Sequence, residues 1–142
     1  LLKRPKNNIE KEPEPLSEVL ENISATVDFD RLIGDFIDAT IKIHRENAHL
    51  HNTLHSLEVS DEDVNDEFMG LQNTITEKVS EKLTSLGYNP PHLKERVHLA
   101  MNAIQSFAHE SVYDTHDYLD YGVMRVKISV MIKNLFVSDL RN

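Results

Sequence analysis

The stretch FDRLIGDFIDATIKIHRE, Phe29 to Glu46, repeats apolar residues at intervals of three and four positions. This spacing returns to one side of an α-helix on successive turns, so it predicts an amphipathic helix with a single buried face. The residues of that face are Phe29, Leu32, Ile33, Phe36, Ile37, Thr40, Ile41 and His44. A face of this width has to be covered by other elements, and the neighbouring sequence supplies further helices.

Patterns of the same kind occur on both sides of this stretch. LSEVLENI, Leu16 to Ile23, predicts a short helix, and another short helix is expected to carry Leu50, Leu54 and Leu57. The segment SDED, from Ser60, is a capping signal for a long helix that we expect to end at Gly87 in a left-handed cap. Two apolar helices follow, after the prolines at 90 and 91. We therefore predict an all-α bundle of about five to six helices.

Composition narrows the classes of function. The chain has 142 residues, a formal net charge of −9 and no cysteine, so disulfides, thiolate metal sites and cysteine nucleophiles are excluded. The negative charge argues against binding of a phosphate backbone by this chain itself. No apolar run approaches the roughly 20 residues of a membrane span, and no glycine-rich phosphate loop is present. We expect a soluble, cytoplasmic protein that is not an enzyme and needs no cofactor.

The last two predicted helices are apolar around most of their circumference. They are HLKERVHLAMNAIQSFAHESV, from His92, and YLDYGVMRVKISVMIKNLFV, from Tyr118 to Val137. In a small domain only one side of a helix can face the core, so the second apolar side requires a partner chain. The sequence thus predicts an oligomer interface at the C-terminal helix pair.

The order of these helices, with the turn HRENAHL from His44 to Leu50 closing the first long one, resembles the C-terminal domain of TetR-family transcriptional regulators. The resemblance covers about Phe29 to Val137 and lies in pattern and helix order. It departs from the family at Arg45, where proline is frequent.

The resemblance implies a homodimer in which the last two helices of each chain form a four-helix bundle. The interface residues expected from it are Ile104, Phe107, Val123, Val126, Val130 and Leu135. It also implies that residues 29–142 form the ligand-binding and dimerisation domain, and that residues 1–28 lead in from a DNA-binding domain missing from this chain. Contact with DNA is expected only through that domain.

The family further implies an apolar pocket for a small, lipophilic inducer between the earlier helices. Polar or soft residues beside the apolar faces are the candidates, because such groups orient a ligand in a largely apolar site. They are Phe36, Thr40, Met69, Gln72, Asn73, Met101, Asn102, Gln105 and His109. The competing interpretation is that these are half-exposed boundary positions or core residues.

Histidines suggest the alternative of a helical metal-binding or protein-interaction module unrelated to transcription. His51 and His55 stand four positions apart, so they could bind one metal together with His109, Asp114 or His116. Glu46–His49 and Glu95–His98 match the Glu-x-x-His pattern of di-iron bundles, which require inward-facing glutamates in mid-helix. Chance accounts for two such pairs in this composition, and we favour a chain without a metal.

Overall fold

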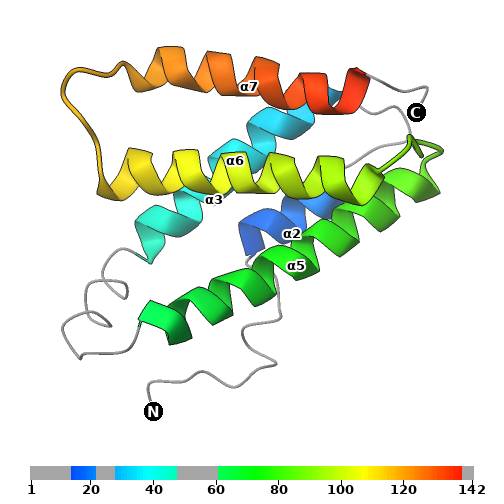
Figure 1. The fold of residues 1–142 in the computed structure, drawn as a ribbon, viewed down its shortest axis with the longest axis horizontal. Helices are drawn as coiled ribbons and strands as arrows, with labels where there is room; N and C mark the ends of the chain where they lie inside the picture. The colour runs from blue at the N-terminus through cyan, green and yellow to red at the C-terminus, as the bar shows by residue number, and fades with distance from the viewer. Residues whose placement is uncertain (1–13, 22–27, 48–60, 139–142) are drawn as a thin grey trace.

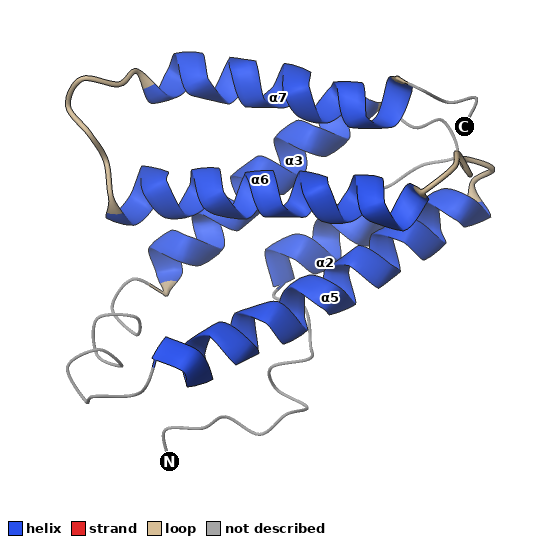
Figure 2. Ribbon diagram, in the orientation of Figure 1, coloured by secondary structure: helices blue, strands red, loops and turns tan. Residues whose placement is uncertain are grey.

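The computed structural model describes residues 14–21, 28–47 and 61–138, with side chains omitted for 14, 17 and 61–72. Within these ranges every regular element is a helix (Figure 2), which confirms the all-α class. The five helices are α2 (Glu14–Glu21), α3 (Phe29–Glu46), α5 (Asp61–Ser85), α6 (Leu93–Tyr113) and α7 (Tyr121–Val137). The short helix expected to carry Leu50, Leu54 and Leu57 lies outside the described residues, as do His49, His51 and His55.

Local sequence signals account for the ends of the helices. The Asp28 side chain accepts a hydrogen bond from Arg31 N at 3.2 Å and caps α3. Gly87 has a φ of 92° after α5, and the amide of Tyr88 donates to the Leu83 carbonyl at 3.0 Å. The predicted left-handed cap is therefore confirmed.

The last helix starts later than the pattern from Tyr118 suggested. The Asp120 carboxylate accepts from the amides of Gly122 and Val123 at 3.0 and 3.2 Å, so Asp120 is the N-cap and α7 begins at Tyr121. Leu119 fits the apolar spacing but precedes the helix, because the Asp120 side chain binds the first free amides of α7 and so fixes where the helix begins.

The helices form a bundle in which α3 and α6 occupy the middle (Figure 1). α7 contacts both of them along one edge, while α2 packs on α3 and α5 packs on α6 at the opposite edge. α6 and α7 run side by side in opposite directions, and α3 crosses behind α6. As a result α7 has packed neighbours on one side only among the described helices.

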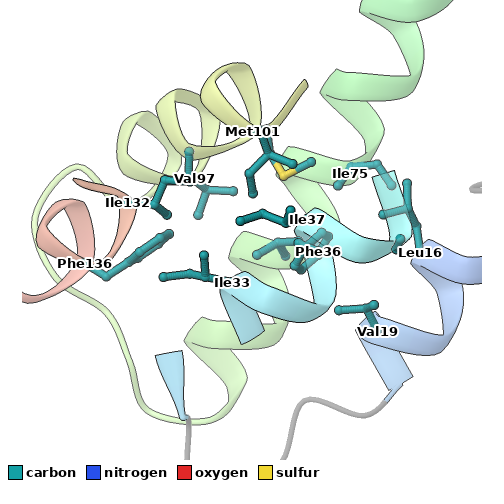
Figure 3. Packing of buried hydrophobic residues seen from close by; sticks show 14 of the residues in the cluster. Leu16, Val19, Ile33, Phe36, Ile37, Ile75, Val97, Met101, Ile132 and Phe136 are labelled. Carbon is teal, nitrogen blue, oxygen red and sulfur yellow. The ribbon is translucent and has the colours of Figure 1, made fainter. Parts of the chain in front are cut away.

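The core lies where α3, α5, α6 and α7 meet. Its most completely buried large side chains are Ile37, Ile75, Val97 and Ile132, together with Leu83. Figure 3 shows Ile37 of α3 between Val97 and Met101 of α6, with Ile132 and Phe136 of α7 beyond Val97. This arrangement removes from water the apolar face that the spacing from Phe29 predicted.

The short helix α2 belongs to the same core. Leu16 and Val19 are buried against it, and α2 contacts both α3 and α5. The short helix predicted from Leu16 therefore packs on the helices that follow it.

Polar contacts fix the position of α7. Arg96 of α6 donates from Nη1 to the carbonyls of Leu135 and Ser138, each at 2.7 Å, which satisfies carbonyls at the C-terminal end of α7. Arg125 and Lys133 of α7 reach Asp38 and Asp30 of α3 at 2.6 and 2.9 Å. Among the helices described, none combines the length and apolarity needed to cross a membrane.

Candidate functional site

Three of the predicted ligand residues are buried inside the bundle. Phe36 and Met101 are packed in the hydrophobic core (Figure 3), and Thr40 is buried one turn after Phe36. The Thr40 hydroxyl donates to the Phe36 carbonyl of its own helix at 2.7 Å. These side chains fill the space between α3 and α6, so they contact the protein's own core in this arrangement.

A buried histidine lies next to this group. His44, at the C-terminal end of α3, is only 5% exposed. Its Nδ1 lies 2.8 Å from the Thr40 carbonyl, and its Nε2 lies 3.1 Å from Nε2 of Gln105 on α6. A carbonyl oxygen can only accept a hydrogen bond, so Nδ1 carries the hydrogen; a side-chain amide nitrogen can only donate, so Nε2 accepts. The contacts correspond to a neutral imidazole in the Nδ1–H tautomer.

Two further side chains of α6 surround His44. The Tyr113 hydroxyl donates to the His44 carbonyl at 2.7 Å, and the ring centroids of the two residues are 5.7 Å apart. The ring of His109 stands perpendicular to that of His44 at 6.2 Å. Burial raises the pKa of the Tyr113 hydroxyl above its ordinary value. The structure thus gathers Thr40, Gln105 and His109, three predicted ligand residues, around a histidine.

The remaining predicted ligand residues lie elsewhere or outside the described side chains. Asn102 is exposed on α6, and the side chains of Met69 and Gln72 are not described. Asn73 is exposed and lines an open groove between α5 and α6 of about 500 Å³. The other residues lining this groove are Thr76, Glu77, Lys94, Glu95, His98 and Leu99. The predicted set is therefore split between the interior and one outer side of α6.

Charged groups border the groove. Lys94 of α6 forms an ion pair with Glu77 of α5, with 3.1 Å between Nζ and Oε2. A second groove of about 540 Å³ shares Glu77, Lys94 and Glu95 and continues toward Ser85 and Asn89. Thr76, which is buried beneath the first groove, has a hydroxyl without a hydrogen-bond partner among the described residues. A space of this size accommodates a small organic molecule.

The predicted interface residues divide into two groups. Val123, Val126 and Val130 are 52%, 62% and 56% exposed on α7, and Leu135 is half-buried. Ile104 and Phe107, in contrast, are buried in the core of their own chain. Those two side chains are not available to a partner in this arrangement, because the broad apolar arc of α6 faces α3 and α7 at these positions.

Residues that the interface prediction did not include extend the exposed apolar surface. Met131 on α7 is 66% exposed, and Leu99 on α6 is also exposed. We call Val123, Val126, Val130 and Met131 the outer face of α7. α7 has three charged residues. Two of them, Arg125 and Lys133, form ion pairs with α3 and therefore lie away from the outer face.

The described residues proposed for metal chemistry come together at most in pairs: Nε2 of His116 lies 3.9 Å from Oδ2 of Asp114. Glu46 and Glu95 have largely exposed side chains, and Glu95 lies 3.9 Å from His92 of its own helix turn. Within the described parts of the chain, no group of three or more histidine, aspartate or glutamate side chains is placed to hold a metal ion. The pair His51 and His55 lies outside these parts.

Comparison with known proteins assigns no relative: no family model, no curated protein and no solved structure matches this chain.

The residues that sequence reasoning passed over are Tyr113 and Thr76, and His44 was treated as a member of an apolar face. One feature of the sequence could have identified His44: it is a polar residue at a position where the helical spacing expects an apolar one. Tyr113 has no such feature, because its partner is a backbone carbonyl 69 residues away.

Proposed function

We propose that this chain is the effector-sensing and dimerisation domain of a bacterial TetR-like transcriptional regulator. The observation that carries the proposal is the outer face of α7. Four adjacent apolar side chains there are each at least half exposed, in a helix whose opposite side packs on α3 and α6. An apolar stripe of this kind on an otherwise charged protein is typical of an interface.

A second copy of the same chain is the partner that fits this surface. In a twofold dimer the same patch of each chain meets itself, which requires an apolar surface with little charge. Arg125 and Lys133 form ion pairs with α3. Lys127 is the third charged residue of α7, and its side chain is exposed. Two α7 helices, flanked by two α6 helices, would then form a four-helix bundle.

Effector binding would act through the helices that pack on this bundle. We place the effector, a small lipophilic molecule, between α5 and α6, where the groove with Asn73 offers about 500 Å³ beside the core. A molecule that binds one arrangement of these helices more tightly than another shifts the population between them. In an intact regulator that shift would change the separation of two DNA-binding domains, which lie outside this chain.

The oligomeric state tests the proposal directly. Light scattering coupled to size-exclusion chromatography should give twice the protomer mass for the wild-type chain. Val126→Glu and Val130→Glu should give the protomer mass, because dimerisation would bury the new carboxylates. Thr84→Glu, an exposed position on α5, is the matched control and should remain dimeric. Circular dichroism should show the same helix content in all four proteins.

A wild-type chain that stays monomeric at tens of micromolar, or a dimer unaffected by both glutamates, would overturn the interface. Native mass spectrometry of the purified protein addresses the effector. An organic adduct of a few hundred daltons per protomer, lost on denaturation, would support the sensing function and identify a candidate ligand.

A further inference from the structure

The ring of His44 connects two helices through its two nitrogens. Nδ1 is held by the Thr40 carbonyl within α3 at 2.8 Å, and Nε2 faces the Gln105 amide nitrogen of α6 at 3.1 Å. Because the first contact places the hydrogen on Nδ1, the second depends on the lone pair of Nε2. With the amide in this orientation, the contact between the helices requires a neutral ring.

We propose that the His44–Gln105 contact is a proton-responsive joint between α3 and α6. The neutral ring accepts the hydrogen bond of the Gln105 amide. Uptake of a proton at Nε2 leaves two donors, N–H on the ring and N–H on the amide, facing each other at the same position. The imidazolium can therefore keep its contact with Gln105 only when the amide turns over and its oxygen accepts from Nε2–H, while Nδ1–H remains bound to Thr40.

Titratable side chains of α6 surround His44. His109 and Tyr113 of α6 are the titratable side chains whose rings pack on His44 from the facing helix. Tyr113 is neutral over the range in which imidazoles titrate, since its pKa is raised above the ordinary tyrosine value. Within α3, Thr40 and His44 are both buried and lie one turn apart.

The joint is placed where it can influence the rest of the bundle. It lies at the C-terminal end of α3, one turn beyond Thr40 and two turns beyond Phe36 and Ile37 of the core. The Tyr113 hydroxyl holds the His44 backbone carbonyl by a separate bond, which protonation of the ring does not remove. Acidification should thus turn over the Gln105 amide at the end of α3 without unfolding the core. This inference is independent of the proposed regulator function.

Nuclear magnetic resonance of ¹⁵N-labelled histidines in the full chain tests the proposal. At pH 8 the wild-type spectrum should show a hydrogen on Nδ1 of His44 and none on Nε2. During acidification the side-chain amide of Gln105 should shift with the same midpoint as the His44 ring, because its oxygen takes the place of its nitrogen at Nε2.

Two substitutions at Gln105 separate a proton-responsive contact from simple packing. Gln105→Glu replaces the donor by an acceptor of opposite charge to the imidazolium, so the midpoint of His44 should rise by about 1–3 pH units. Gln105→Leu removes both roles, and its midpoint should stay well below that of Gln105→Glu. A neutral Nε2–H tautomer in the wild type, or equal midpoints in the two variants, would falsify the proposal, whereas the oligomeric state would be unaffected by either result.

Discussion

Arg125 of α7 forms an ion pair with Asp38 of α3, with 2.6 Å between Nη1 and Oδ1, and the same guanidinium donates to the Gly34 carbonyl at 3.3 Å. One side chain thus connects the edge helix to two successive turns of the central helix. Together with the pair Lys133–Asp30 it lies on the side of α7 that faces inward, where Ile132 and Phe136 are buried in the core. The apolar outer face follows from this orientation.

Removing the Arg125 guanidinium should destabilise the protein modestly. The side chains of Arg125 and Asp38 are 34% and 67% exposed, so solvent screens the pair, and we expect Arg125→Ala to lower the free energy of unfolding by no more than about 1 kcal/mol. Urea denaturation of Arg125→Ala, Asp38→Asn and the double variant measures the coupling of the two groups. The coupling should decrease at high salt; a value independent of salt would contradict the assignment to an ion pair.

Adjacent residues on α7 should respond in opposite ways to truncation. Ile132 is 1% exposed in the core, whereas Met131 is on the outer face. Ile132→Ala should lower the free energy of unfolding by about 2–5 kcal/mol because it leaves a cavity. Met131→Ala should hardly affect the protomer and should instead weaken dimerisation. Denaturation at several protein concentrations distinguishes the two effects, and equal losses in both variants would mean that the two sides of α7 are wrongly assigned.

Two buried threonines, Thr76 and Thr40, differ in whether the hydroxyl has a hydrogen-bond partner among the described residues. The Thr76 hydroxyl is buried without one, whereas the Thr40 hydroxyl donates to the Phe36 carbonyl at 2.7 Å. Valine has nearly the shape of threonine, so Thr76→Val should raise the free energy of unfolding by about 1 kcal/mol, and Thr40→Val should lower it by about 0.5–1.5 kcal/mol. Thermal and urea denaturation measure both. Loss of stability in Thr76→Val would indicate that the hydroxyl has a partner in solution.

High pH should destabilise the fold through its tyrosines. Burial raises the pKa of Tyr88 above 10.0, an effect that Arg96 partly offsets, and burial also raises the pKa of Tyr113. Desolvation is the main cause of the raised pKa of Tyr121, and the neighbouring Glu110 adds to it. A raised pKa in the folded state stabilises the protein fully below pH 10.0, and this stabilisation is lost as the pH rises through the folded values.

Ultraviolet absorbance of phenolate measures these ionisations. The folded chain should titrate at higher pH than the same chain in denaturant, and the free energy of unfolding should fall above about pH 10. Tyr88→Phe removes one of the three groups together with the hydrogen bond from its hydroxyl to the Phe136 carbonyl. Superimposable titrations of folded and denatured protein would contradict the prediction.

Much of the secondary structure was predictable because its causes are local. The period of three and four from Phe29, the Asp28 cap and the glycine at position 87 each act within one or two turns of the chain. The candidate site was predictable only in part. Gln105 and His109 were recognised as polar residues beside an apolar stripe, but their neighbour His44 was placed with the core residues.

The sequence by itself therefore determined an all-helical chain, the ends of its main helices and the excess of apolar surface on α6 and α7. Which part of that surface belongs to the core was decided by tertiary structure alone. Ile104 and Phe107 are buried because α3 crosses α6 at their position, while Val126 and Val130 stay exposed because Ile132 and Phe136, on the opposite side of α7, are buried in the core. A broad apolar arc has no preferred inward direction until the neighbouring helices supply one.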